Sequence, residues 1–230
     1  MSSTRLPGKV LRPLAGAPML LRQIERLRRC RRIDRLVVAT SDHLTDHVLA
    51  DVLEDAAVAV YRGPLDDVLS RFIGAMEAHG PADHVVRLTG DCPLADWELI
   101  DAVIARHLDA EADYTSNTWG RRSYPKGLDA EVVRAQVLRQ ADAETSDAYD
   151  REHVTPFVYS RPERFRLEGL SQELDEGEVR WTVDRPDDYQ FVCAVYEALY
   201  PADPAFTSDS VRSLVEGDPE LQRFGGDRRI

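Results

Sequence analysis

Residues 83–108 read DHVVRLTGDCPLADWELIDAVIARHL. The segment 83–90 is a short apolar run of the kind that forms a buried strand, and the segment after it has the pattern of a helix. Near-continuous apolar strands are typical of parallel sheets that helices cover on both faces. The stretch therefore predicts one strand–loop–helix unit of an α/β protein.

The same alternation extends along the chain. Further strands are predicted at residues 33–40, 58–63, 112–118, 128–133, 164–170 and 178–183, and helices at residues 18–30, 43–56, 64–80, 137–145, 147–162, 184–200 and 207–217. In such sheets ligands lie beyond the carboxyl ends of the strands. No internal repeat or low-complexity linker interrupts the pattern. We predict a single domain over residues 1–217 and a flexible tail over residues 218–230.

Composition excludes several classes of protein. The 230 residues are 43% hydrophobic and 30% charged, as in soluble globular proteins. The net charge of -12 argues against a sequence-independent nucleic-acid binder, which needs a cationic surface. Three widely spaced cysteines form neither a disulfide framework nor a zinc motif, and no apolar stretch has the length of a membrane helix. We expect a cytoplasmic protein that binds neither nucleic acid nor membrane.

The opening segment, MSSTRLPGKV, has the composition of a phosphate-binding loop. Its hydroxyl-bearing, flexible and cationic residues are Ser2, Ser3, Thr4, Arg5, Gly8 and Lys9. Such a set suits a polyphosphate. Lys9 and Lys126 are the only lysines among 29 basic residues, and a lysine offers a compact point charge that an arginine does not. The alternative interpretation is a flexible, solvated N-terminus.

Two aspartates follow apolar strands at distant points of the sequence. Asp91 lies in LTGDCP and Asp184 in WTVDRPDD. Strand-end carboxylates from two segments can converge on one divalent cation, which favours several oxygen ligands. Each aspartate is also followed by a proline that can begin a helix, so each can instead be a helix N-cap.

Other polar groups leave more than one interpretation open. His43 and His47 have helical spacing, which indicates a solvated helix face more than a metal site. The basic run at residues 28–35 is interpreted as an exposed helix end, with a subunit contact or nucleic-acid patch as the alternative.

Three further side chains are also ambiguous. Arg71 either reaches a ligand or pairs with Asp67 one helical turn away. Glu152 and His153 in DREHVTP either do acid–base or binding work or mark a structural break in a helix.

Taken together, these segments resemble one family. The segments are SSTRLPGKVL, VVATSD, DDVLSRF, VVRLTGDCPL, YTSNT, YPKGLDAEV, REHVTPFVY and RWTVDRPDDY, in that order, from residue 2 to about residue 200. They resemble the spore coat polysaccharide biosynthesis type of cytidylyltransferase, a group related to the enzymes that make CMP-activated ketodeoxyoctonate and acylneuraminate. The resemblance implies a GT-A-like, Rossmann-type nucleotidyltransferase fold with a mostly parallel mixed sheet and helices on both faces. It also implies a small projecting β-element within about residues 118–180 that mediates a homodimer.

The resemblance further implies that CTP and a sugar acid, or a related acceptor, give a CMP-conjugate and pyrophosphate. The implied roles are the triphosphate for Arg5 and Lys9, loop shape for Ser2, Ser3, Thr4 and Gly8, the nucleotide for Thr40, Asp42 and Arg71, Mg²⁺ for Asp91 and Asp184, and the acceptor for Asp129, Glu131, Glu152 and His153. The reaction needs positioning and charge stabilisation and no protein nucleophile.

The chain departs from the family at its start. Members place a strand of the form VAIIQAR before the loop, and this sequence contains neither that strand nor its arginine. We expect a sheet that lacks the usual first strand and leaves backbone groups of its neighbours exposed. One hypothesis is that Met1 is an internal methionine taken as the start; another is a nucleotide-binding protein that has lost catalysis. A third, a sugar-nucleotide glycosyltransferase, is disfavoured because residues 89–91 lack the first aspartate of an Asp-X-Asp motif.

Overall fold

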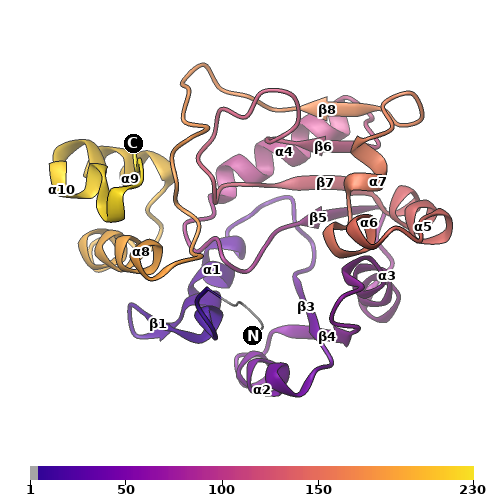
Figure 1. Cartoon of the computed structure of the whole chain (residues 1–230), viewed down its shortest axis with the longest axis horizontal. Helices are drawn as coiled ribbons and strands as arrows, with labels where there is room; N and C mark the ends of the chain where they lie inside the picture. Colours follow the sequence, from indigo (N-terminus) through magenta and orange to yellow (C-terminus); the bar gives the residue numbers. More distant parts are fainter. Residues whose placement is uncertain (1–4) are drawn as a thin grey trace.

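The computed structural model describes residues 5–230 and is shown in Figure 1. Its helices are α1 (Met19–Leu27), α2 (His47–Asp55), α3 (Val68–His79), α4 (Trp97–Asp109), α5 (Ala135–Glu144), α6 (Ala148–His153), α7 (Pro156–Tyr159), α8 (Pro186–Leu199), α9 (Ser208–Gly217) and α10 (Pro219–Gln222), with short 3₁₀ turns η1 (Lys9–Leu11), η2 (Leu44–Asp46) and η3 (Phe224–Gly226). Ser2, Ser3 and Thr4 lie outside the described residues.

The strands lie in three sheets. They are β1 (Pro13–Leu14), β2 (Ala17–Pro18), β3 (Val37–Ser41), β4 (Ala59–Gly63), β5 (His84–Arg87), β6 (Tyr114–Ser116), β7 (Glu131–Arg134) and β8 (Leu167–Gly169). One sheet pairs β1 with β2, a second pairs β3 with β4, and the third has the order β5-β7-β6-β8. The pairs β3·β4 and β6·β8 are parallel, and the other three are antiparallel. The α/β class predicted from the sequence is confirmed.

The edges of β3 and β5 carry no second partner among the described strands. In Figure 1 the two strands lie apart. Val37 and Val38 of β3, and Val85 and Val86 of β5, are only half-buried, whereas a central strand of a covered sheet is buried on both faces. Among the described residues, β3 and β5 are therefore edge strands of their sheets.

Helix ends follow local capping chemistry. Asp96 accepts hydrogen bonds from the backbone N–H groups of Glu98 and Leu99, so that α4 begins six residues after Asp91. Pro186 occupies the first turn of α8, where its missing N–H costs nothing. The predicted broken helix at 147–162 is two helices, separated at Val154, which has a φ of 75°.

Two predicted features differ in the structure. The expected strand at 178–183 forms only a single bridge, between Arg180 and Lys126. The projecting β-element is a pair of loops, 117–127 and 170–180, joined by hydrogen bonds such as that from the Glu176 N–H to the Ser123 carbonyl (2.9 Å). These loops lie side by side in Figure 1. Side-chain contacts from Ser123 and Gln172 hold them together where strand pairing does not.

The residues expected to form a flexible tail have secondary structure. Residues 218–230 contain α10 and η3, and Leu221 packs in the same buried cluster as Phe191 of α8. Arg229 is completely buried. A charged side chain has this depth only where it is paired, and the sequence gives no sign of its partner.

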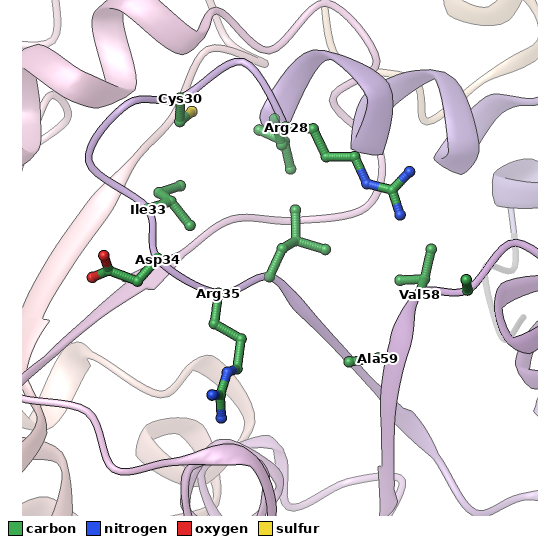
Figure 2. A pocket seen from close by; sticks show the side chains of 10 residues that line it. Arg28, Cys30, Ile33, Asp34, Arg35, Val58 and Ala59 are labelled. Carbon is green, nitrogen blue, oxygen red and sulfur yellow. The ribbon is translucent and has the colours of Figure 1, made fainter.

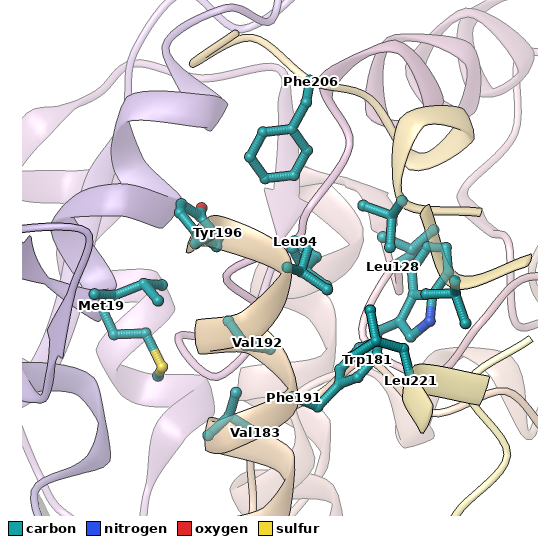
Figure 3. Close-up of a cluster of buried hydrophobic side chains, with 14 of the residues drawn as sticks. Met19, Leu94, Leu128, Trp181, Val183, Phe191, Val192, Tyr196, Phe206 and Leu221 are labelled. Carbon is teal, nitrogen blue, oxygen red and sulfur yellow. The ribbon is translucent and has the colours of Figure 1, made fainter. Parts of the chain in front are cut away.

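One buried cluster joins the segments that precede or follow the predicted site residues. It contains Leu6 of the opening loop, Leu94 after β5 and Val183 before Asp184. Figure 3 shows Leu94 and Val183 around the apolar face of α8. Each fully buried side chain of this size contributes roughly 1.5–3 kcal/mol. The core therefore fixes three loops that are distant in sequence at one place.

Candidate functional site

The ammonium of Lys9 joins the two predicted metal-binding carboxylates. Its Nζ donates to Asp91 Oδ2 (2.9 Å), Asp184 Oδ1 (3.0 Å) and the Val183 carbonyl (2.8 Å). Arg5 adds an ion pair to the same oxygen of Asp184 (3.1 Å). The structure thus brings Arg5, Lys9, Asp91 and Asp184 together from three distant segments.

Backbone geometry puts each group in place. Gly8 has a φ of 68°, a left-handed conformation that favours glycine, and this turn begins η1 with Lys9 as its first residue. The Val183 N–H donates to the Asp91 carbonyl (2.8 Å). The two aspartates are therefore held by main-chain pairing of their own segments as well as by the lysine.

The charges of this group stabilise each other. Burial lowers the pKa of Lys9, but the negative charges and hydrogen bonds of Asp91 and Asp184 outweigh it, so the pKa is raised. Burial would raise the pKa of Asp184, and the hydrogen bonds from Lys9 and Arg180 reverse that effect, so its pKa is lowered. Lysine is cationic and Asp184 anionic at neutral pH.

The helix N-cap alternative is wrong for both aspartates. The N-cap of α4 is Asp96, and the N-cap of α8 is Arg185, with Asp188 accepting from the Arg185 N–H (2.9 Å). Instead, the carboxylates of Asp91 and Asp184 each accept a hydrogen bond from Lys9 Nζ. Their side chains are not used to begin a helix.

Arg180 is a site residue that the sequence analysis missed. Its Nη2 donates to Asp184 Oδ2 (2.8 Å) and to Asp188 Oδ2 (2.8 Å). It lies four residues before Asp184 on a segment that is not helical, so no periodic signal in the sequence links the two. Only the nearby motif WTVD marks the region.

A hollow opens beside this group. Its volume is about 270 Å³, and it is lined by Arg5, Lys126, Glu178, Arg180, Arg185 and Asp227. Lys126 pairs there with Glu178 (2.9 Å). Four of the lining side chains are cationic and two, Glu178 and Asp227, are carboxylates. The lining therefore has an excess of positive charge, which suits an anion.

The residues predicted to contact the nucleotide, Thr40, Asp42 and Arg71, form a second group, at the ends of β3 and β4. Thr40 is buried and donates to Asp46 Oδ2 (2.7 Å), whereas Asp42 is exposed. The Arg71 side chain passes so close to Gly63 that a Cβ there would lie 2.9 Å from Arg71 Cγ. Because residue 63 is a glycine, the Arg71 side chain has room to lie beside the ends of β3 and β4.

Arg71 has a donor without a partner. Its Nε is buried and has no hydrogen-bond partner within the described part of the chain. Burial lowers the pKa of Arg71, against nearby aspartates that raise it. The alternative pairing with Asp67 is not what the structure shows, because Asp67 accepts from Arg151 Nε (2.7 Å). An unsatisfied buried donor is costly unless a ligand completes it.

The residues predicted to contact the acceptor, Asp129, Glu131, Glu152 and His153, are divided. Asp129 is held by both terminal nitrogens of Arg122 (2.7 and 2.8 Å). Glu131, at the start of β7, accepts from Arg87 at the end of β5 (2.8 Å) and from Thr155 Oγ1 (2.6 Å). Arg87, Arg122 and Thr155 were not predicted from the sequence as site residues.

Glu152 and His153 lie on α6. Glu152 is exposed, and the ring of His153 lies 4.3 Å from the ring of Tyr149, edge to face. Tyr149 is itself 58% exposed, so the pair forms an open surface and not an enclosed acid–base site. Within residues 5–230, the contact from this segment to Glu131 is made by Thr155, which follows the break at Val154.

His43, which the sequence also singled out, has a structural role. His43 Nδ1 accepts from the Thr45 N–H (3.3 Å) and caps η2. Within residues 5–230, no group of three or more His, Cys, Asp or Glu side chains could hold a metal ion. No helix in the same range is long and apolar enough to cross a membrane.

A larger hollow, of about 320 Å³, lies at the opposite ends of β3 and β4. Figure 2 shows Ile33, Val58 and Ala59 as its apolar wall, with Arg28 and Arg35 at its margin. It contains none of the predicted site residues. Ligand sites in α/β sheets lie at the carboxyl ends of the strands, so the smaller hollow beside Asp184 is the candidate site.

Comparisons with known proteins identify the family of the chain. The Cytidylyltransferase family matches residues 1–199. The chain is 37% identical to the spore coat polysaccharide biosynthesis protein SpsF of Bacillus subtilis over 228 residues, which is 96% of this chain and 92% of that protein. It is 38% identical to a 3-deoxy-manno-octulosonate cytidylyltransferase of Anaeromyxobacter dehalogenans over 147 residues, 64% of this chain and 57% of that enzyme.

Solved structures show the same fold. A cytidylyltransferase from Leptospira borgpetersenii superposes with a TM-score of 0.89 and 27% identity, over 96% of this chain and 92% of that one. The CMP:2-keto-3-deoxy-manno-octonic acid synthetase in complex with CTP superposes with a TM-score of 0.63 and 16% identity, over 85% and 94%. The expected Rossmann-type nucleotidyltransferase fold is confirmed, and the chain belongs to the cytidylyltransferase family.

Proposed function

We propose that this protein transfers CMP from CTP to an oxygen of a sugar acid or a related acceptor, releases pyrophosphate, and uses Mg²⁺ held by Asp91 and Asp184. The observation that carries the proposal is the convergence of these two carboxylates on one cation, the ammonium of Lys9, at 2.9 and 3.0 Å. The family and the relatives that act on 3-deoxy-manno-octulosonate support CTP and a sugar acid as the substrates.

The donor set fits Mg²⁺. This ion is commonly bound by one or two carboxylates, with phosphates of the substrate and water as the other ligands. Oδ2 of Asp91 and Oδ1 of Asp184 already share one positive charge. Mg²⁺ bound there would neutralise charge on the phosphates and polarise them.

Lys9 and Arg5 would then bind the phosphates. Both side chains now neutralise Asp184, and a metal ion at the carboxylates would release them for the triphosphate. Preorganised cations of this kind stabilise the negative charge that develops as an acceptor oxygen attacks the α-phosphorus and pyrophosphate leaves. The buried, unpartnered Nε of Arg71 is a donor for the nucleotide at the ends of β3 and β4.

The acceptor would lie toward Asp129 and Glu131. Each carboxylate is held by an arginine, Arg122 or Arg87, which fixes its orientation for hydrogen bonds to hydroxyl groups. We also propose a homodimer through the paired loops 117–127 and 170–180, where Leu174 is 56% exposed. The protein would act in the cytoplasm, where CTP is available.

The test is a screen of acceptors with CTP and Mg²⁺, with the CMP-conjugate detected by mass. A CMP-conjugate with one sugar acid, and none with UTP or ATP as the donor, is the expected result. Binding of CTP by calorimetry without any conjugate would instead support a nucleotide-binding protein without turnover. No binding of CTP would contradict both.

A further inference from the structure

The last four residues fold back onto the segment that carries Asp184. The Arg180 N–H donates to the Arg228 carbonyl (2.9 Å), and the Trp181 indole N–H donates to the Arg229 carbonyl (2.8 Å). The Arg229 guanidinium returns a hydrogen bond to the Arg180 carbonyl (2.6 Å). We call residues 227–230 the C-terminal brace.

The C-terminal brace contains a buried charged side chain, Arg229. Arg229 Nη2 donates to Asp188 Oδ1 (3.1 Å), and both side chains are 0% exposed. The guanidinium also lies 4.7 Å from the centre of the Phe191 ring. A buried ion pair of this kind contributes little net stability compared with apolar packing. Stability alone therefore does not explain its presence.

Asp188 connects Arg229 to Asp184. Its Oδ2 accepts from the backbone N–H groups of Asp184 (3.0 Å) and Arg185 (2.9 Å). Arg180 is bonded to Asp188 through Nε (2.9 Å) and Nη2 (2.8 Å), and the same Nη2 reaches Asp184 Oδ2 (2.8 Å). Arg229 therefore reaches the backbone of Asp184 through Asp188, and the carboxylate of Asp184 through Asp188 and Arg180.

The arrangement leaves Asp184 with one oxygen for a cation. Arg180 occupies Oδ2, whereas Oδ1 faces Lys9 and Arg5. A carboxylate that is free to rotate presents either oxygen, and a fixed one presents a defined lone pair. Groups that orient a metal ligand in this way change metal affinity by about 10–100-fold when they are removed.

We propose that Arg229 is a positioning residue for the metal-binding carboxylate of the proposed active site: the C-terminal brace fixes Asp188 and Arg180, and these fix Asp184. The inference rests on the proposed function of Asp184. Arg229 lies beyond residues 1–199, which the Cytidylyltransferase family matches.

Electrostatics and positioning predict different patterns of affinity. Mn²⁺·CTP is an anion and CTP without the metal carries still more negative charge, so the loss of a positive charge weakens the binding of both, and of CTP alone at least as much. The loss of a positioning residue weakens only the binding that goes through the metal, because the carboxylate loses its orientation. A loss of affinity for Mn²⁺·CTP that CTP alone does not share therefore separates the two explanations.

The experiment measures the affinity of the full chain for Mn²⁺·CTP by water proton relaxation, and its affinity for CTP alone by calorimetry in the presence of a chelator. Arg229→Met removes the charge and keeps an apolar stem against Phe191; Arg229→Lys keeps the charge; Arg228→Met is the exposed neighbouring control. We expect Arg229→Met to bind Mn²⁺·CTP about tenfold more weakly with CTP alone unchanged, Arg229→Lys to recover most of the affinity, and Arg228→Met to match the wild type.

Equal or tighter binding of Mn²⁺·CTP by Arg229→Met would overturn the proposal, as would an equal loss of affinity for CTP alone. If circular dichroism shows that Arg229→Met is unfolded, Arg180→Met decides, since Arg180 is partly exposed. Weaker binding of Mn²⁺·CTP with the affinity for CTP alone unchanged supports the brace. Unchanged or tighter binding of Mn²⁺·CTP, or an equal loss of affinity for CTP alone, overturns it. Asp184→Asn tests the site itself. If Asp184→Asn binds Mn²⁺·CTP as well as the wild type does, the proposed function of Asp184 fails and the brace fails with it.

Discussion

At the scale of single residues, Lys9 has two opposing roles in this account. It bridges Asp91 and Asp184 when no metal is bound, and it would bind phosphate during the reaction. We predict that Lys9→Ala lowers turnover more than about tenfold, the scale for losing one preorganised contact to a transition state. The same change removes a cation that competes for the carboxylates, so Mn²⁺ without nucleotide should bind more tightly.

Steady-state kinetics and Mn²⁺ relaxation test both parts of that prediction. Arg106→Ala is the control, because Arg106 is a cation outside the candidate hollow and pairs with Glu168 (2.7 Å). Unchanged kinetics in Lys9→Ala would refute its role in the reaction.

The sequence shows these residues only in part. Lys9, Asp91 and Asp184 were predicted because each follows a recognisable local pattern, a basic glycine loop or the end of an apolar strand. Arg180 and Arg229 were not, because their importance comes from contacts across 4 to 49 residues of sequence that have no periodic signature. Ion-pair partners are set by tertiary packing, which one sequence does not display.

At the scale of elements, Gly127 controls how the loop 117–127 meets the segment before Asp184. A Cβ at Gly127 would lie 2.5 Å from the Thr182 backbone nitrogen, and the φ of Gly127 is 109°. We predict that Gly127→Ala lowers both the melting temperature and kcat/KM, because Asp184 shifts with Thr182.

Gly120 is the matched control for that prediction. It also has a positive φ, 75°, but a Cβ there meets no atom within 4 Å. Gly120→Ala should cost only the backbone strain of about 1–2 kcal/mol and leave kcat/KM unchanged. Equal losses in thermal unfolding and in kcat/KM for the two variants would contradict the close-approach explanation.

The elements β5, α4 and β6 enclose a histidine pair. His84 Nδ1 lies 2.9 Å from His107 Nε2, and His107 Nδ1 lies 3.0 Å from Thr115 Oγ1. Burial, with the charges of His84 and Arg134, lowers the pKa of His107 to about 4. In the unfolded chain this pKa is about 6.5.

The unfolded state therefore binds the extra proton first as pH falls. Above about pH 6.5, His107 is neutral in both states and does not change the free energy of unfolding with pH. As pH falls from 6.5 toward 4, the free energy of unfolding decreases by up to about 1.4 kcal/mol per pH unit. Urea unfolding between pH 5 and 7.5 measures this slope. His107→Gln should flatten it, and an equally steep slope in that variant would assign the effect to other groups.

The elements were more predictable than their pairing. Alternating apolar runs gave most helices and strands near their observed bounds, but the segment 178–183 is extended without a ladder, because Lys126 supplies only one bridge. Residues 218–230 have a polar, glycine-containing sequence, which predicts a flexible tail. In the structure, the buried ion pair between Arg229 and Asp188 attaches this segment to α8.

At the scale of the whole molecule, we predict a dimer that depends on the paired loops. Leu174 is 56% exposed in the loop 170–180, and a glutamate there places a charge in the proposed interface. Leu174→Glu should shift the mass measured by light scattering from dimer to monomer. Leu44, which is 75% exposed on η2, is the control, and a dimer that survives Leu174→Glu but not Leu44→Glu would place the interface on the other face.

The central claim is that Asp91 and Asp184 support transfer of CMP from CTP. The most direct measurement is coupled pyrophosphate release from CTP with Mg²⁺ and a panel of sugar acids that includes 3-deoxy-manno-octulosonate, for the wild type and for Asp91→Asn and Asp184→Asn. The account predicts release with at least one sugar acid in the wild type, and loss of Mg²⁺-dependent turnover in both folded variants. Release by Asp91→Asn at the wild-type rate, or no release from any acceptor in the wild type, would contradict it.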